Sequence, residues 1–195
     1  MSDAPDMFRY DVVTRTLHWL TFLLVVLLWI VGQTIDLFPR DAGRPEARSM
    51  HIVLGVVLAA TVAFRLLWRK TSWGRRQPVR KGLGDLAAQG VHIGLVVLLI
   101  ATVALGLLNV VVRGDAVFTW VKVPALAPGW PELRHIVGEA HEWSANLLLS
   151  VAGLHAVAAL GHRFVLRDRV LRRMMWCRTK TCRAGEAGGH RRAAA

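Results

Sequence analysis

Residues 141–155 read HEWSANLLLSVAGLH and carry a histidine at each end of a strongly apolar stretch. The fourteen-residue spacing is close to four helical turns, so His141 and His155 leave the same face of one predicted helix. Their heights along that helix differ by about 21 Å at the usual rise per residue. Histidine is rare and costly inside a membrane, where it marks a functional site by default. The pattern therefore predicts a membrane-spanning helix that supplies one ligand to each of two separate centres.

The composition is typical of a membrane protein. Of the 195 residues 54% are hydrophobic, and the mean hydropathy is +0.39, far above that of a soluble domain of this size. The net charge of +12 does not indicate a nucleic-acid partner, because the basic residues cluster at the ends of apolar segments, as orientation signals do. Cys177 and Cys182 match neither a disulfide framework nor a metal motif, and the N-terminus lacks the basic region of a cleavable signal peptide.

Four apolar segments are long enough to cross a hydrocarbon core, which takes about 20 residues as helix. A chain in lipid must pair its backbone polar groups internally, so each segment is expected to be helical. The sequence therefore predicts an all-α, integral membrane four-helix bundle over residues 1–176, followed by a basic tail, residues 177–195, that we expect to be disordered. The predicted spans cover residues 17–37, 50–68, 86–112 and 136–165.

The distribution of lysine and arginine predicts the orientation of these spans. One side of the predicted membrane domain holds 18 of these residues, in the N-terminal segment, the loop of residues 69–85 and the C-terminal stretch from Arg163 to Arg192. The other side holds six. Because the side with more lysine and arginine faces the cytoplasm, both termini are predicted to be cytoplasmic.

With this topology, four histidines match in depth as two pairs. His18 and His155 lie near the cytoplasmic surface, and His51 and His141 lie near the outer surface. Neutral imidazole is a common axial ligand of haem iron, and facing helices of a bundle are a usual place for such a site. A zinc or copper site fits less well, because it needs three or four converging ligands, commonly with cysteine or carboxylate.

Three further residues lie near the predicted cytoplasmic surface. His92 has a depth similar to that of His155 and is an alternative inner ligand on depth alone, or a candidate for contact with a quinone or a haem propionate. His162 follows His155 by seven residues, so it is a candidate for contact with a quinone head group or a haem propionate, or it extends to the interface. Arg65 is a candidate for a propionate contact, although snorkelling of its side chain to the interface is the simpler interpretation.

The motifs assembled so far resemble the bacterial cytochrome b561 family, whose helical core is similar to that of the membrane cytochrome b subunits of nickel–iron hydrogenases. The resemblance covers the chain up to about residue 176, and the order, spacing and membrane side of the motifs are specific together although each motif is weak alone. The motifs are R-x-x-H-W at Arg15–Trp19, H-x-x-x-G at His51–Gly55, N-x-x-x-R-G at Asn109–Gly114 and H-x13-H at His141–His155.

The resemblance implies four transmembrane helices in a bacterial inner membrane that hold two b-type haems, each with two histidine ligands. Carried over to this chain, His18 and His155 would hold the cytoplasmic haem, and His51 and His141 the periplasmic haem. His92 would then hold neither. The same resemblance implies electron transfer between a periplasmic donor and the quinone pool.

One stand-alone branch of the family oxidises superoxide and passes the electron to ubiquinone, and the size of this chain is similar to that branch. It would then be a quinone-linked oxidoreductase, a superoxide oxidase. Three outer residues, Arg113, Lys122 and Arg134, are candidates for steering an anionic donor, or they are ordinary loop charges. Two alternatives stay open: an electron-transfer subunit that serves a separate dehydrogenase or periplasmic partner, and a histidine-lined metal or proton transporter without haem.

Overall fold

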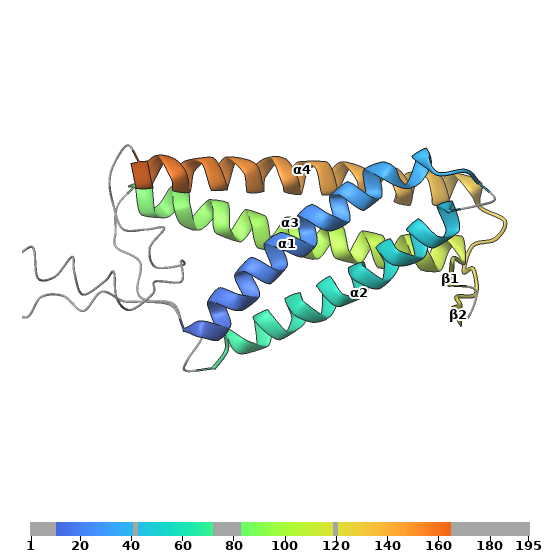
Figure 1. Ribbon diagram of the computed structural model, residues 1–195, viewed down its shortest axis with the longest axis horizontal. Coiled ribbons are helices and arrows are strands. Elements are labelled where there is room, and N and C mark those ends of the chain that lie inside the picture. Colours follow the sequence, from blue (N-terminus) through green and yellow to red (C-terminus); the bar gives the residue numbers. More distant parts are fainter. Residues whose placement is uncertain (1–10, 41–42, 72–82, 119–120, 165–195) are drawn as a thin grey trace, which may run out of the picture.

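The chain folds as a bundle of four long helices, so the predicted all-α membrane fold is confirmed (Figure 1). The computed structural model describes residues 11–40, 43–71, 83–118 and 121–164. Its helices are α1 (Val12–Thr34), the short 3-10 helix η1 (Ile35–Leu37), α2 (Arg44–Trp68), α3 (Leu83–Arg113) and α4 (Pro131–Phe164). Two short antiparallel strands, β1 (Ala116–Val117) and β2 (Val121–Lys122), form a hairpin between α3 and α4, with Ala116 opposite Lys122.

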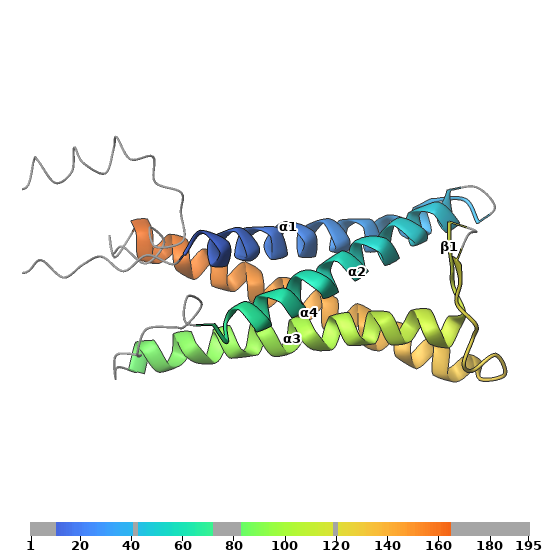
Figure 2. The ribbon, with the colours of Figure 1, turned by 90° about the horizontal axis from the view of Figure 1, so that it is seen from below.

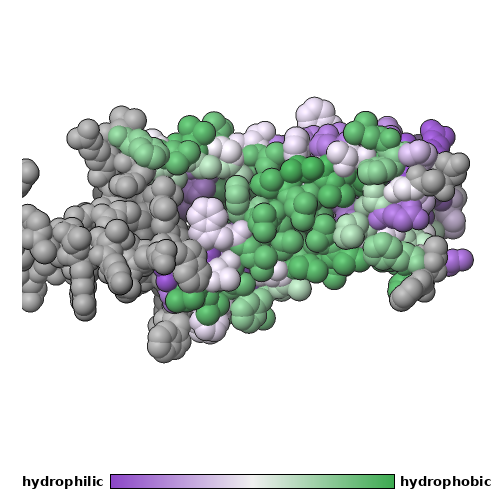
Figure 3. Space-filling view, in the orientation of Figure 1, coloured by the Kyte–Doolittle hydropathy of each residue, from purple (hydrophilic) through white to green (hydrophobic). Residues whose placement is uncertain are grey.

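All four long helices are long and apolar enough to cross a membrane. The spanning segments are Val12–Leu37, Arg44–Trp68, Leu86–Arg113 and Pro131–Gly161. A broad apolar band covers the middle of the molecule, and hydrophilic residues gather at the hairpin end (Figure 3). Large apolar side chains are exposed within the spanning segments, for example Leu23 at 61% and Val97 at 58%. This pattern matches a surface that faces lipid rather than water.

The bundle consists of two closely packed helix pairs, α1 with α2 and α3 with α4 (Figures 1 and 2). Contacts between the pairs are fewer. The start of α1, the end of α2, the start of α3 and the end of α4 lie together at one end, which we call the inner end (Figure 1). The outer end carries η1 and the β-hairpin (Figure 1). The sequence prediction assigns the inner end to the cytoplasm.

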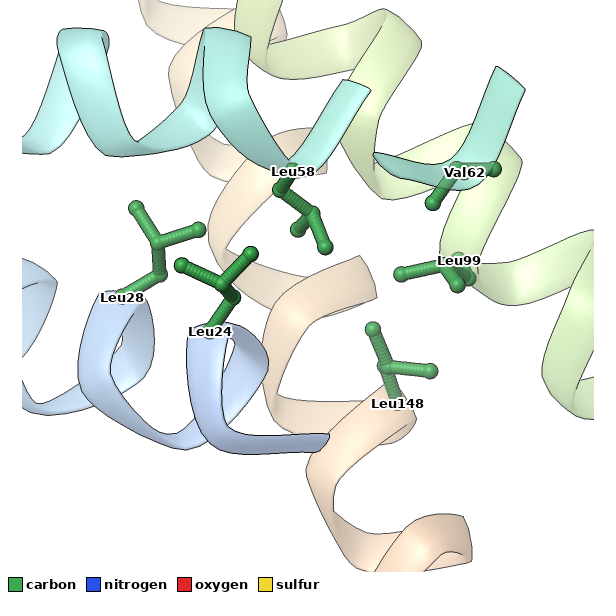
Figure 4. Close-up of a cluster of buried hydrophobic side chains, with 6 residues drawn as sticks. All are labelled: Leu24, Leu28, Leu58, Val62, Leu99 and Leu148. Atoms are coloured by element: carbon green, nitrogen blue, oxygen red, sulfur yellow. The ribbon is translucent and has the colours of Figure 1, made fainter. Parts of the chain in front are cut away.

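A cluster of aliphatic side chains fills the middle of the bundle and receives residues from all four helices (Figure 4). In α4 the cluster residue Leu148 lies midway between His141 and His155. It therefore separates the two ends of the molecule by an apolar layer. Its members, the apolar cluster, are Leu24, Leu28, Leu58, Val62, Leu99 and Leu148.

The helices begin earlier than the apolar stretches that predict them, because polar residues cap their first turns. Asp11 caps α1 by accepting a hydrogen bond from the backbone N–H of Thr14 at 2.8 Å. At the start of α2, Pro45 occupies the first turn and Glu46 accepts a bond from the backbone N–H of Gly43 at 3.0 Å. The caps extend the helices beyond the apolar core into the region where a membrane surface would lie.

Asp11 also joins two helices, because its carboxylate accepts a hydrogen bond from the indole N–H of Trp68, at the end of α2, at 3.2 Å. We expect Asp11→Ala to lower the free energy of unfolding by about 1 kcal/mol at pH 7, the usual effect of losing a cap. Partial burial raises the pKa of Asp11, but the hydrogen bonds from Thr14 and Trp68 outweigh it and hold the pKa below 3.8.

A carboxylate with a lowered pKa stabilises the fold above its unfolded pKa and loses that effect as the pH falls through the folded pKa. The difference in Tm between the wild type and Asp11→Ala should therefore disappear as the pH falls below 3.8. Thermal unfolding of the purified protein in detergent measures both values. Asp11→Asn is the control, because asparagine caps helices but does not titrate. A pH-independent difference between wild type and Asp11→Ala would contradict the assignment.

The loop at the outer end is tied to the start of α2 by a buried serine. Ser49, only 2% exposed, donates to the carbonyl of Pro45 at 2.8 Å and accepts from the backbone N–H of Phe118 at 3.0 Å. The neighbouring Arg48 lies 3.4 Å from the carboxylate of Asp115. These contacts place the β-hairpin beside the first turns of α2, two residues before His51.

Candidate functional site

The outer histidines face each other across the two helix pairs. His51 comes from α2 and His141 from α4, and both side chains are half-buried. Their ring centres lie 6.2 Å apart, and their planes are nearly perpendicular at 89°. Two residues that are 90 positions apart in the sequence are thus brought to one level, as the depth argument predicts. We call them the outer pair.

The hydrogen bond of His141 defines which of its nitrogens is free to bind a ligand. Nδ1 of His141 lies 3.0 Å from the backbone carbonyl oxygen of Thr102 in α3. Because a carbonyl only accepts, Nδ1 carries the hydrogen and donates it. In the neutral ring Nε2 then holds the lone pair. A ring held in this way, with the far N–H bonded to a carbonyl, is the usual arrangement of a metal-binding histidine.

The same arrangement recurs at His51 in the other helix pair. Nδ1 of His51 is buried, and the carbonyl of Leu28 in α1 faces it without completing a hydrogen bond of good geometry. Each facing carbonyl is followed four residues later by a glycine that touches the same ring. A Cβ atom at Gly32 would lie 3.3 Å from Cε1 of His51, and one at Gly106 would lie 2.9 Å from Cε1 of His141. The partner helix of each pair therefore forms a cradle, a carbonyl plus a glycine, for one histidine.

The inner end gathers three histidines and one arginine. His92 of α3 and His155 of α4 are in ring contact, with centres 5.0 Å apart and an angle of 70° between planes. His18 of α1 lies within electrostatic range of both rings. Its Nδ1 lies 3.5 Å from a guanidinium nitrogen of Arg65 in α2. The structure thus brings His18, His92 and His155 together, and it is His92 rather than His18 that touches His155. We call these four residues the inner group.

Comparison with known proteins identifies the class of molecule. A sequence profile described as "Prokaryotic cytochrome b561" matches residues 9–176, which is most of the chain. The chain belongs to the prokaryotic cytochrome b561 family. It is therefore a membrane b-type cytochrome that works in electron transfer, a multi-pass protein of the bacterial inner membrane, and its cofactor is haem b.

Several curated proteins are similar over nearly their whole length. Cytochrome b561 homolog 2 of Escherichia coli strain K12 is 29% identical over 178 residues, which cover 89% of this chain and 94% of that protein. Probable superoxide oxidase CybB of Yersinia pestis is 25% identical over 171 residues, or 86% of this chain and 96% of the relative. Cytochrome b562 of Cereibacter sphaeroides is 29% identical over 186 residues, which cover 90% and 98% of the two chains.

The outer pair fits the geometry that a haem iron of a b561 cytochrome requires. A bond of about 2 Å between a metal and an imidazole nitrogen puts each ring centre about 3 Å from the metal. Two imidazoles that held one metal between them would therefore have ring centres about 6 Å apart, and the ring centres of His51 and His141 lie 6.2 Å apart. Within the described ranges, no three histidine, cysteine, aspartate or glutamate side chains come together as a metal site. The outer pair therefore fits a cofactor that needs two axial ligands better than a zinc ion that needs three or four.

The other candidate residues of this b561 protein lie at the ends of the bundle. At the outer end, Arg113 contacts Asp115 at 3.8 Å, Arg134 donates to the carbonyl of Pro128 at 2.6 Å, and Lys122 is exposed on β2. His162 belongs to α4 near the inner end, but its side chain is outside the described residues. The predicted tail with Cys177 and Cys182 also lies outside them. Arg113 and Arg134 are thus engaged by their own loop.

Sequence reasoning missed the atoms that hold the outer pair in place. The carbonyl of Thr102 carries no signal in the sequence, because every residue has one. Gly32 and Gly106 are visible as glycines within apolar helices, a pattern that indicates close approach of another group. Gly55 shares that pattern and follows His51 by four residues, yet no atom lies within 4 Å of a Cβ built there. The pattern alone therefore does not tell which glycine meets a histidine ring.

Proposed function

We propose that this cytochrome holds two haems and carries electrons across the membrane between a donor on the outer side and the quinone pool. In this proposal His51 and His141 bind the outer haem, and His18 and His155 bind the inner one. The observation that carries the proposal is the outer pair, with rings 6.2 Å apart and Nδ1 of His141 bonded to the Thr102 carbonyl.

The residues around the outer pair have clear tasks in this scheme. The haem supplies the one-electron chemistry, and the protein supplies ligation, orientation and burial. The carbonyl of Thr102 holds Nδ1–H of His141, so that Nε2 of that ring is available as the ligand atom, and the carbonyl of Leu28 faces the ring of His51. Gly32 and Gly106 leave room for the rings to lie against the neighbouring helices. The apolar cluster keeps water out of the layer between the two sites.

The inner group is the proposed place of exchange with the quinone. Arg65 and His92 supply a cation and an exposed imidazole beside the proposed inner ligands, and both are suited to contact a quinone head group or a haem propionate. His162 is proposed for the same role because it follows His155 by seven residues on the same helix. The inner end faces the cytoplasm in this proposal, as the lysine and arginine distribution predicts.

Superoxide is the donor that we propose. One relative is named probable superoxide oxidase, and Arg113, Lys122 and Arg134 place positive charge at the outer end, where it can steer a small anion. Two superoxide ions would each lose one electron and become dioxygen, and one quinone would take up two electrons and two protons to become the quinol. Arg113 is partly neutralised by Asp115, whereas Lys122 is exposed on β2.

A haem count tests the ligand scheme. A reduced-minus-oxidised spectrum of the purified protein, with haem quantification, should show two b-type haems per chain. His51→Leu and His141→Leu should each retain one haem, because a leucine at either position removes an axial ligand of the same centre. A b-type signal that amounts to fewer than two haems in the wild type, or two haems in either variant, would overturn the scheme.

A second experiment tests the donor and the acceptor. The purified protein alone, supplied with superoxide and a ubiquinone analogue, should reduce the quinone. The rate should fall as salt is added, because screening weakens electrostatic steering of an anion. A protein that binds two haems but reduces no quinone under these conditions would be a subunit that depends on a separate partner.

A further inference from the structure

Both proposed haem sites take one histidine from each helix pair. The outer site uses α2 and α4, and the inner site uses α1 and α4. The helices make more contacts within each pair than between the pairs. A slide of one pair along the other would therefore separate the ligands of both sites, although each pair stayed intact. The apolar cluster joins the pairs, and a directional contact beside it would fix their relative height.

One polar contact joins α1 to α4 in the middle of the bundle. The indole N–H of Trp29 donates to the side-chain oxygen of Asn146 at 2.8 Å. Because an indole only donates, it also fixes which end of the amide faces α1. Both residues are partly buried, and an apolar environment leaves no competing water to replace a lost partner.

The position of this bond matches the heights of the proposed ligands. Trp29 is eleven residues from His18 along α1, and Asn146 is nine residues from His155 along the antiparallel α4. At a rise of about 1.5 Å per residue, these two distances along the helix axes are about 16.5 Å and 13.5 Å. The bond thus holds α1 and α4 at the register that brings His18 level with His155. In the outer direction, Trp29 is three residues from Gly32 and Asn146 is five from His141.

We propose that the Trp29–Asn146 hydrogen bond is a register contact that sets the height of the α1–α2 pair relative to the α3–α4 pair and so positions the axial ligands of both haems. The inference rests on the proposed function, since it concerns the geometry of two histidine-ligated haems. Trp29 and Asn146 are positioning residues, and neither is proposed to touch the iron.

The test is the electron paramagnetic resonance spectrum of the oxidised holoprotein. The low-spin signal of a haem with two histidine ligands depends on the angle between the imidazole planes, so a change of register shifts it. We expect Trp29→Phe and Asn146→Leu each to keep two haems per chain and to shift the low-spin signals of both. The double variant removes donor and acceptor together and leaves no unpaired buried group. It should therefore unfold at a higher temperature than Asn146→Leu and show shifted signals as well.

Ser150→Ala is the matched control. Ser150 lies one turn further along α4 and donates at 2.8 Å to the backbone carbonyl of Asn146, a bond that stays within one helix. Its loss should leave both signals unchanged, and equal shifts in this control would overturn the proposal. If a single variant loses its haem, the spectrum of the double variant tests the register contact instead. If the double variant binds two haems and shows wild-type signals, the register contact is refuted. The proposed function would still stand in that case, because the haem count of the histidine variants tests it separately.

Discussion

Replacing His18 with leucine is expected to remove one haem per chain, which halves the haem content, and to abolish electron transfer from the outer face to quinone. Leucine keeps the helix and its apolar character but has no lone pair for the iron. In the proposed scheme the remaining haem is the outer one, so an electron that enters there has no second centre through which to reach the inner end. Haem quantification and the rate of quinone reduction measure the two effects, and we expect the rate to fall by a factor of about 100 or more, a barrier change of about 2.7 kcal/mol.

His92→Leu is the matched control for His18→Leu. His92 is the residue in ring contact with His155, with centres 5.0 Å apart, yet the proposed scheme gives it no role as an axial ligand. Both haems should therefore stay bound in His92→Leu. If this variant loses a haem and His18→Leu retains both, the inner ligands are His92 and His155, and α3 rather than α1 supplies the second histidine.

A single methyl group at Gly106 is expected to displace His141 and to empty most of the outer haem site. The added Cβ would lie 2.9 Å from Cε1, 3.3 Å from Nδ1 and 3.7 Å from Nε2 of His141. Contacts as short as the first do not occur between carbon atoms, so the ring must move away from α3. Moving it breaks the bond from Nδ1 to the Thr102 carbonyl, which orients Nε2 as a ligand. Loss of such a supporting contact typically lowers metal affinity by a factor of about 10–100. The haem content of purified Gly106→Ala measures the effect.

Gly94→Ala provides the comparison within the same helix. No atom lies within 4 Å of a Cβ built at Gly94, so this variant should bind haem like the wild type. It should also gain about 0.5–1 kcal/mol of stability from the better helix propensity of alanine. Gly32→Ala should be intermediate, because its Cβ would lie 3.3 Å from Cε1 of His51. Equal haem loss in Gly94→Ala would show that the effect comes from the backbone and not from the ring contact.

The fold and the outer pair could be predicted because both follow from properties that can be read directly along the sequence. Span length and hydropathy predict four helices, and the alternation of direction gives each histidine a depth. Depth alone makes His51 and His141 level partners, and in the folded chain their ring centres lie 6.2 Å apart. Depth does not separate His18 from His92, so both are candidates at the inner end.

The remaining features depend on how each helix is rotated and where it crosses its neighbours, and apolar sequences constrain that weakly. The carbonyl of Thr102 meets Nδ1 of His141 only because α3 and α4 pack along most of their length. The bond between Trp29 and Asn146 spans 117 residues, and nothing near either residue in the sequence indicates the other. Ser49 is the most buried side chain in the described part of the chain, and the sequence alone does not indicate this.

The apolar cluster has a further consequence for energy conversion. Its six side chains are aliphatic and come from all four helices, so none of them can take up or pass on a proton. Electrons that tunnel between the two proposed centres would cross it without compensating cations. Such a transfer is electrogenic: a charge that crosses the full membrane does work of about 2.3 kcal/mol for each 100 mV of membrane potential. An interior-negative potential opposes inward electron flow, so turnover should slow in energised vesicles and recover when an ionophore collapses the potential.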